Sequence, residues 1–147
     1  MIHRDIKTHN ILVNNDLTTT SSSVKVGSAV VWQQYDPLLL EEVGSSGYTA
    51  PEIFTHRGYD SKVDVWSFGI VLWELAASCP KDRINPFMGM PGDEFVSKAQ
   101  GGCRPNFTDE HQICVRSVVE RCWKFDPLQR PNMNEVVEQL DKLYNEL

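Results

Sequence analysis

The chain has 147 residues, 41% of them apolar and 23% charged, which is the composition of one soluble globular domain with its own core. Its formal net charge of −6 argues against a nucleic-acid binder, because such proteins usually carry a surplus of basic residues on one face. The longest apolar run, at residues 68–79, is interrupted by Glu74 and is too short to span a bilayer. The first residues show no secretory signal. We therefore expect no membrane span and no nucleic-acid partner.

The first half of the chain predicts a short β pair followed by a long irregular segment. Two β-like runs, residues 11–13 and 24–26, flank six consecutive hydroxyl residues at 18–23, which we interpret as a solvated loop. Residues 31–48 show no periodicity and contain Pro37. Long irregular segments inside a compact domain are usually functional or disordered.

The second half of the chain predicts helices. The first covers residues 62–77, with Asp60-Ser61 as its N-cap, and its apolar residues surround it, so it should be buried on most sides. A later helix begins after a capping box formed by Asn132 and Glu135. This last helix is predicted over residues 133–147, and two others over residues 93–100 and 109–123. The fold class is therefore mainly α, with a short β pair near the N-terminus.

The four cysteines show neither Cys-x-x-Cys spacing nor a His/Cys pattern typical of zinc sites. We interpret them as buried free thiols rather than disulfides or metal ligands. This favours a reducing, cytoplasmic location. The four are Cys79, Cys103, Cys114 and Cys122.

Residues 3–10 read HRDIKTHN and hold the side chains best suited to chemistry. A carboxylate can accept a proton from a substrate hydroxyl, a cation can steady a phosphoryl group, and an amide oxygen can reach a metal ion. The stretch resembles the catalytic loop of protein kinases, H-R-D-L-x-x-x-N, with Ile6 in place of Leu. The resemblance implies that Asp5 is the base, Lys7 the phosphate contact and Asn10 a metal ligand. Lysine two residues after the aspartate is the pattern of serine/threonine kinases.

Three more motifs occur in the order and spacing of that family. Residues 47–52, GYTAPE, resemble the end of a kinase activation segment, and residues 64–69, DVWSFG, resemble the start of the central helix of the large lobe. Residues 122–131 resemble the end of the domain in tyrosine-kinase-like members. The resemblance covers essentially the whole chain and implies part of a kinase domain. Its parts would be the catalytic loop and β pair (1–27), the activation segment (28–52) and a helical subdomain (53–147).

The resemblance also implies structural roles. Glu52 should pair with Arg130 and tie the activation segment to the helical base. Asp64 should accept hydrogen bonds from the backbone around His3 and Arg4. Arg4 would bind a phosphate on the activation segment, because guanidinium and phosphate pair well. The candidate phosphorylation sites are Ser45, Ser46 and Thr49. For each of them an unmodified turn residue is the alternative.

The chain departs from the family at the Asp-Phe-Gly motif. When residues 24–27 are aligned as the preceding strand, Ser28 stands where the metal-binding aspartate is expected, followed by Ala29 and Val30. A serine hydroxyl is a far weaker ligand for Mg²⁺ than a carboxylate, and Asn10 is neutral as well. The chain also starts at the catalytic loop, without a glycine-rich loop, a strand lysine or a regulatory-helix glutamate. A missing N-terminal lobe would remove half of the ATP cleft.

Three hypotheses follow. The first is a serine/threonine kinase that uses ATP and Mg²⁺ on a protein substrate, with its N-terminal half outside this chain, so that the isolated chain is inactive and binds ATP and Mg²⁺ poorly. The catalytic loop with Asp5 and Asn10 favours it. The second is a pseudokinase or interaction module that offers the lobe to a protein partner, which Ser28 and Ala29 favour. The third is a degenerate copy without a function.

Overall fold

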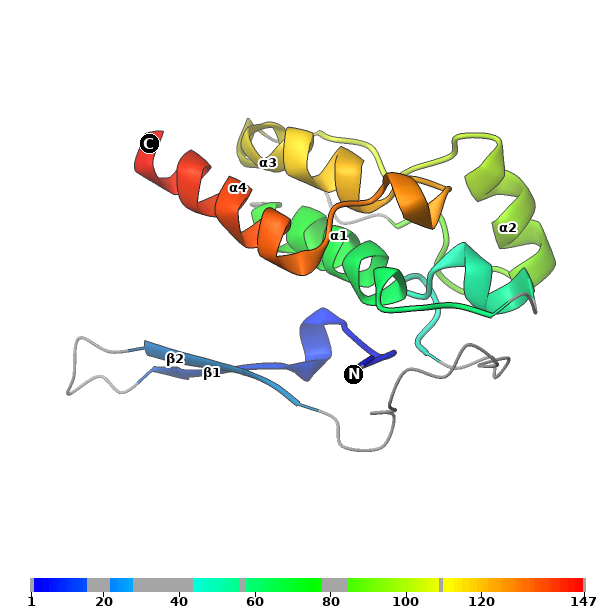
Figure 1. Ribbon diagram of the computed structural model, residues 1–147, viewed down its shortest axis with the longest axis horizontal. Helices are drawn as coiled ribbons and strands as arrows, with labels where there is room; N and C mark the ends of the chain where they lie inside the picture. The colour runs from blue at the N-terminus through cyan, green and yellow to red at the C-terminus, as the bar shows by residue number, and fades with distance from the viewer. Residues whose placement is uncertain are drawn as a thin grey trace.

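A computed structural model describes residues 2–15, 22–27, 44–55, 58–77, 85–108 and 110–146. Within these ranges, a two-stranded sheet lies beside a set of four α-helices (Figure 1). The predicted fold class, mainly α with one β pair near the N-terminus, is confirmed. None of the helices in the described ranges combines the length and the apolar character that a membrane crossing requires.

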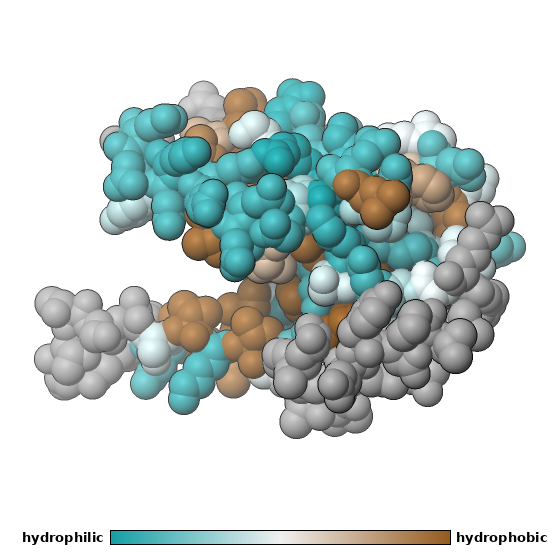
Figure 2. Space-filling view, viewed as in Figure 1, coloured by the Kyte–Doolittle hydropathy of each residue, from teal (hydrophilic) through white to brown (hydrophobic). Residues whose placement is uncertain are grey.

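The sheet is an antiparallel hairpin of β1 (Ile11–Asn15) and β2 (Ser22–Val26). Both strands occur where the β-like runs predict them, and each extends further towards the connection. Figure 1 shows the hairpin projecting beside the helices. Its apolar side chains are therefore largely exposed, and they gather as a hydrophobic area in Figure 2. They are Leu12, Val13, Val24 and Val26.

The central element is α1 (Lys62–Ala76), whose buried residues lie on all sides of the helix, as its apolar pattern predicts. Its first turn is capped by Asp60, whose carboxylate accepts a hydrogen bond from the Lys62 amide at 2.8 Å. Ser61 makes no capping bond with its side chain, so the predicted Asp60-Ser61 cap is due to Asp60. At Gly69 the helix approaches α3 so closely that an added Cβ would lie 2.8 Å from Cβ of Cys122.

Three shorter helices follow: α2 (Gly92–Gln100), α3 (Glu110–Cys122) and α4 (Met133–Glu146). Their bounds agree with the predicted helices to within a residue. The capping box before α4 is present, because the Asn132 amide donates to the Glu135 carboxylate at 2.6 Å and the Glu135 amide donates to Asn132 Oδ1 at 3.0 Å. The part of the chain that the structure describes also contains three short 3₁₀ helices, which were not predicted because so few residues show no periodicity: Thr8–Asn10, Pro51–Thr55 and Pro127–Gln129.

The main core lies between α1, α2 and the segment that precedes α1. Most of its ring pairs meet edge to face, an arrangement that aromatic pairs favour, and the ring centroids of Phe87 and Phe95 are 4.8 Å apart. The fully buried Trp66 and Trp73 of α1 belong to the same cluster, together with Tyr48 and Ile53. This core therefore fixes the segment 48–53 against the central helix.

The interpretation of the cysteines as buried free thiols holds only in part. Cys103, Cys114 and Cys122 are free thiols, and Cys79 lies outside the described residues. Cys122 is buried, but Cys103 is half-buried and Cys114 is exposed. The expectation of a buried thiol is wrong for Cys114, because it lies on the solvent side of α3, whereas Cys122 faces α1.

Candidate active site

The loop at residues 3–10 is hydrogen-bonded to the first turn of α1 through Asp64. The backbone amides of His3 and Arg4 donate to the two carboxylate oxygens of Asp64, at 2.8 and 2.9 Å, as the resemblance implies. Arg4 has a φ of 67°, a left-handed conformation that is uncommon for a residue with a side chain and persists only where the surroundings hold it. Burial raises the pKa of Asp64, and the hydrogen bonds from the two amides oppose that rise.

His3 joins the loop to the end of the hairpin. Its Nδ1 accepts a hydrogen bond from the Asp5 amide at 3.3 Å, which leaves Nε2 to donate to the carbonyl of Gly27 at 3.1 Å. The Gly27 amide in turn donates to the Asn10 carbonyl at 2.6 Å. The chain is therefore fixed beside the loop immediately before Ser28, which itself lies outside the described residues.

The carboxylate of Asp5 is the centre of a closed polar cluster, which we call the Asp5 cluster and which consists of Asp5, Lys7, Asn10 and Ser45. The Ser45 hydroxyl donates to Oδ1 of Asp5 at 2.7 Å, and the Asn10 amide donates to Oδ2 at 2.9 Å. The Lys7 ammonium lies 3.1 Å from Oδ2 and donates to the Ser45 hydroxyl at 2.6 Å. The fold thus brings the three predicted residues of the loop together with a residue of the later segment.

The surroundings of Asp5 keep it ionised. Partial burial raises the pKa of this carboxyl, but hydrogen bonds from Ser45, Lys7 and Asn10 outweigh it, so the pKa of Asp5 lies below its ordinary value. An ionised carboxylate accepts hydrogen bonds and donates none. The site therefore presents a fixed anion with a cation beside it.

Asn10 has an oxygen available for a cation. Its amide nitrogen donates to both the backbone carbonyl and the side chain of Asp5, whereas its amide oxygen accepts no hydrogen bond from the described residues. However, no group of three or more His, Cys, Asp or Glu side chains that could hold a metal occurs within the described ranges. Mg²⁺ is usually held by one or two carboxylates together with phosphates. The described residues alone do not make a complete Mg²⁺ site.

The three candidate phosphorylation sites all have hydrogen-bond partners. Ser45 contacts Asp5 and Lys7, the Ser46 hydroxyl accepts a bond from the Gly89 amide at 2.6 Å, and the Thr49 hydroxyl donates to the Ser45 carbonyl at 2.9 Å. The contact between Ser45 and Asp5 was missed, because nothing in the spacing of two residues 40 positions apart indicates it. Phosphorylation at the three sites stays a prediction.

A second buried carboxylate joins three segments. Glu74 of α1 accepts hydrogen bonds from the Tyr48 hydroxyl at 2.7 Å and from the Thr8 hydroxyl at 3.2 Å. The Ser67 hydroxyl, two turns earlier on the same face of α1, donates to the Tyr48 carbonyl at 2.8 Å. From the sequence, Glu74 only interrupts an apolar run. In the structure it connects the loop at residues 3–10, the segment before Pro51 and the central helix.

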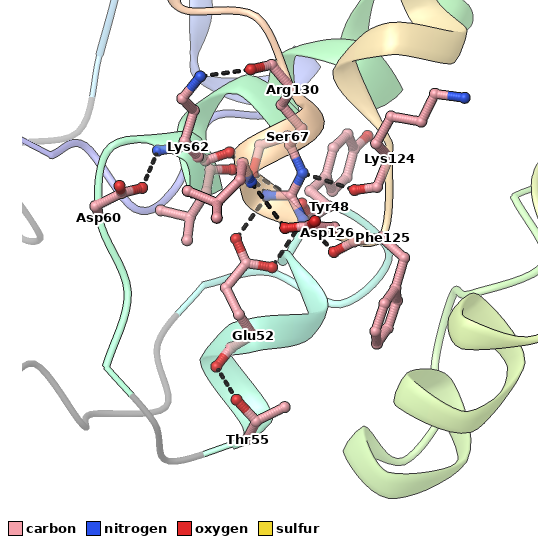
Figure 3. Close-up of polar contacts among 12 residues, drawn as sticks. Tyr48, Glu52, Thr55, Asp60, Lys62, Ser67, Lys124, Phe125, Asp126 and Arg130 are labelled. Carbon is pink, nitrogen blue, oxygen red and sulfur yellow. Dashed lines mark hydrogen bonds and ion pairs between the residues drawn. The ribbon is translucent and has the colours of Figure 1, made fainter.

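Glu52 and Arg130 form the expected ion pair (Figure 3). It is bidentate, with Nη1 to Oε1 at 2.6 Å and Nη2 to Oε2 at 2.9 Å, and the Arg130 side chain is fully buried. The same guanidinium donates to the carbonyls of Lys62, Lys124 and Phe125. The guanidinium of Arg4, by contrast, lies 3.4 Å from the Tyr59 hydroxyl, and its phosphate-binding role stays a prediction.

The profile of the family described as protein tyrosine and serine/threonine kinase matches residues 1–140. The chain belongs to the protein kinase family. Kinases of this family generally use ATP and Mg²⁺ and act on protein substrates. The described fold therefore belongs to part of a kinase catalytic domain.

Curated kinases similar to this chain come from plants, a slime mould and animals. It is 32% identical over 148 residues to serine/threonine-protein kinase STY17 of Arabidopsis thaliana, covering 100% of the chain and 25% of that kinase. It is 33% identical to probable serine/threonine-protein kinase drkC of Dictyostelium discoideum, covering 97% and 19%. It is also 33% identical to mitogen-activated protein kinase kinase kinase 7 of Homo sapiens, covering 97% and 22%. The chain thus spans a quarter or less of the length of these kinases.

Proposed function

We propose that this chain supplies the catalytic loop and helical base of a serine/threonine kinase of the tyrosine-kinase-like group, which transfers a phosphoryl group from ATP to a protein hydroxyl. The observation that carries the proposal is the Asp5 cluster, in which one ionised carboxylate is held by a cation, an amide and a hydroxyl from two segments. This arrangement suits phosphoryl transfer, because proteins catalyse that reaction mostly by positioning the reactants and by electrostatic stabilisation.

In this proposal Asp5 accepts the proton of the substrate hydroxyl. The substrate oxygen then forms a bond to the γ-phosphorus of ATP, the bond to the β-phosphate oxygen breaks, and ADP leaves with the electron pair. Lys7, 3.1 Å from Asp5, reaches the same region and offsets the negative charge of the transferred group. Asn10 and Ser45 keep the carboxylate oriented. A positioned general base of this kind contributes about 10²- to 10⁴-fold to the rate.

The proposal places the rest of the kinase against this chain. The exposed apolar side chains of the hairpin, which Figure 2 shows as a hydrophobic area, support a further lobe or partner there, because such patches usually mark interaction sites. The proposal includes a division into a catalytic loop with the β pair (1–27), an activation segment (28–52) and a helical subdomain (53–147). It also includes a cytoplasmic location.

A pseudokinase or docking module is the alternative, and one sequence feature favours it. Ser28 stands where the family has its metal-binding aspartate. We infer that the isolated chain has no measurable kinase activity and binds ATP with Mg²⁺ weakly or not at all.

A thermal-shift titration with ATP, with and without Mg²⁺, tests the proposal on three forms of the chain: wild type, Ser28→Asp and Ser23→Asp. Ser28→Asp restores a carboxylate next to Gly27 and should give a melting temperature that rises with Mg²⁺ and ATP, because a ligand at a hundred times its Kd stabilises by about 2.7 kcal/mol. The control Ser23→Asp adds the same charge on the exposed hairpin and should not respond.

The absence of any response in all three forms, with cooperative melting, would contradict a nucleotide site on this chain and favour the docking module. A metal-dependent rise in the wild type would support the kinase and would show that Ser28 does not prevent metal binding.

A further inference from the structure

A groove of about 790 Å³ lies away from the Asp5 cluster, between the loop that follows α2 and the second half of α3. Three cationic side chains and one carboxylate line it, whereas the chain as a whole has a net charge of −6. Its apolar wall includes the rings of Phe107 and Trp123, whose centroids are 5.6 Å apart. The charged residues are Arg104, Arg116, Glu120 and Lys124.

The guanidinium of Arg104 has no carboxylate partner among the described residues. Arg104 and Arg130 both contact the ring of Trp66, at 4.9 and 5.1 Å from its centroid, but only Arg130 is neutralised, by Glu52. Burial, together with the charge of Arg130, lowers the pKa of Arg104 to about 10. Arg104 donates only to backbone carbonyls, those of Ala99, Cys103 and Trp123.

Two of the cationic side chains, Arg104 and Lys124, can bind an anionic group of another molecule. The Nε and Nη1 atoms of Arg104 donate to the carbonyls, which leaves its Nη2 without a partner in the described ranges. The ammonium of Lys124 has no described partner either, and Figure 3 shows this side chain pointing away from Arg130. Arg116 is already paired with Glu120, at 2.7 Å, and its guanidinium lies over Phe107. The groove therefore carries positive charge that the described fold does not neutralise.

We propose that this groove binds an acidic peptide segment of a partner protein. Carboxylates of the peptide would contact Arg104 and Lys124, and an aromatic or aliphatic side chain would pack against Phe107. Charge complementarity favours a short acidic segment over a nucleic acid or a membrane surface, because the negative charge of the whole chain repels an extended polyanion whereas the groove is locally positive. The apolar wall favours a peptide over a small inorganic anion.

The test is binding of a fluorescent peptide, acetyl-Glu-Glu-Phe-Glu-Glu-amide, to the full chain at low and high salt, with the Lys-Lys-Phe-Lys-Lys peptide and inorganic phosphate as comparison probes. The acidic peptide should bind at low salt and weaken as salt rises, because the contacts are near the surface. Lys124→Glu should weaken it on the order of tenfold, since it replaces an attraction by a repulsion.

Arg121→Glu is the matched control, because Arg121 is an exposed residue near the C-terminal end of α3 that does not line the groove. It should leave the affinity within about twofold. Both residues are exposed, and circular dichroism of each variant checks that the fold is retained. Equal weakening by the two variants, equal binding of the basic peptide, or displacement of the acidic peptide by inorganic phosphate at a similar concentration would overturn the proposal.

Discussion

Ser45 shows how a single side chain determines the state of the candidate base. Its hydroxyl donates to Asp5 and accepts from Lys7, so it holds the anion and the cation in a fixed relation. A phosphate on Ser45 would place a second negative group next to the Asp5 carboxylate, and the two negative groups would repel each other. Phosphorylation of this residue would therefore oppose the proposed chemistry rather than support it.

The Glu52–Arg130 ion pair gives a second test that concerns individual side chains. From the sequence, Glu52→Ala and Arg130→Ala should destabilise the fold to similar extents, with the double variant little worse than either. The structure predicts instead that Arg130→Ala is the more damaging, because it also leaves three backbone carbonyls without their donor. Removing one partner of a buried pair costs about 3–5 kcal/mol.

Urea denaturation of the two single variants and the double variant measures this difference. A coupling free energy near zero, with the two single effects strictly additive, would contradict the pairing.

Among the elements, the capping box before α4 offers the simplest test. Asn132→Ala removes the acceptor for the Glu135 amide and should lower the free energy of unfolding by about 0.5–2 kcal/mol. Asn134→Ala, at an exposed position in the first turn of the same helix, is the control and should change it little. Thermal melting followed by circular dichroism gives both values. Equal effects of the two variants would show that the cap contributes nothing specific.

The helices and strands were predictable because their residues carry local signals. The apolar periodicity and the Asn132–Glu135 pattern located α4, and two short β-like runs located the hairpin. The family motif pointed to Asp5 as the candidate base. The roles of Ser45 and Glu74 could not be predicted, since each depends on contacts between segments that meet only when the core around Trp66 has formed.

At the level of the whole molecule, the reactivity of the cysteines tests how closely α3 packs on α1. Burial raises the pKa of Cys122 to about 12, whereas Cys114 is exposed. Iodoacetamide should therefore modify Cys114 in the native protein and Cys122 only after unfolding. Mass spectrometry of peptides after brief labelling resolves the two positions. Labelling of Cys122 at the same rate as Cys114 would contradict the close packing of α3 on α1.

The same thiol gives a pH dependence with a definite sign. In the unfolded chain Cys122 ionises near its ordinary pKa of 9.0, whereas in the folded chain its pKa is about 12. Above pH 9 the unfolded state therefore binds fewer protons than the folded state, and the free energy of unfolding should fall as pH rises. Cys122→Ala should remove this part of the alkaline loss, as urea denaturation across this pH range can show, and an unchanged slope would contradict it.

The ionised state of Asp5 is tested most directly by its pKa, measured by ¹³C NMR of its carboxyl group in the wild-type chain and in two variants. We predict a pKa of Asp5 below the ordinary value of 3.8 in the wild type, a rise in Ser45→Ala, and no change in Ser46→Ala, whose hydroxyl does not contact Asp5. A wild-type pKa at or above 3.8, or equal shifts in both variants, would contradict the claim that the fold holds Asp5 ready as an ionised base.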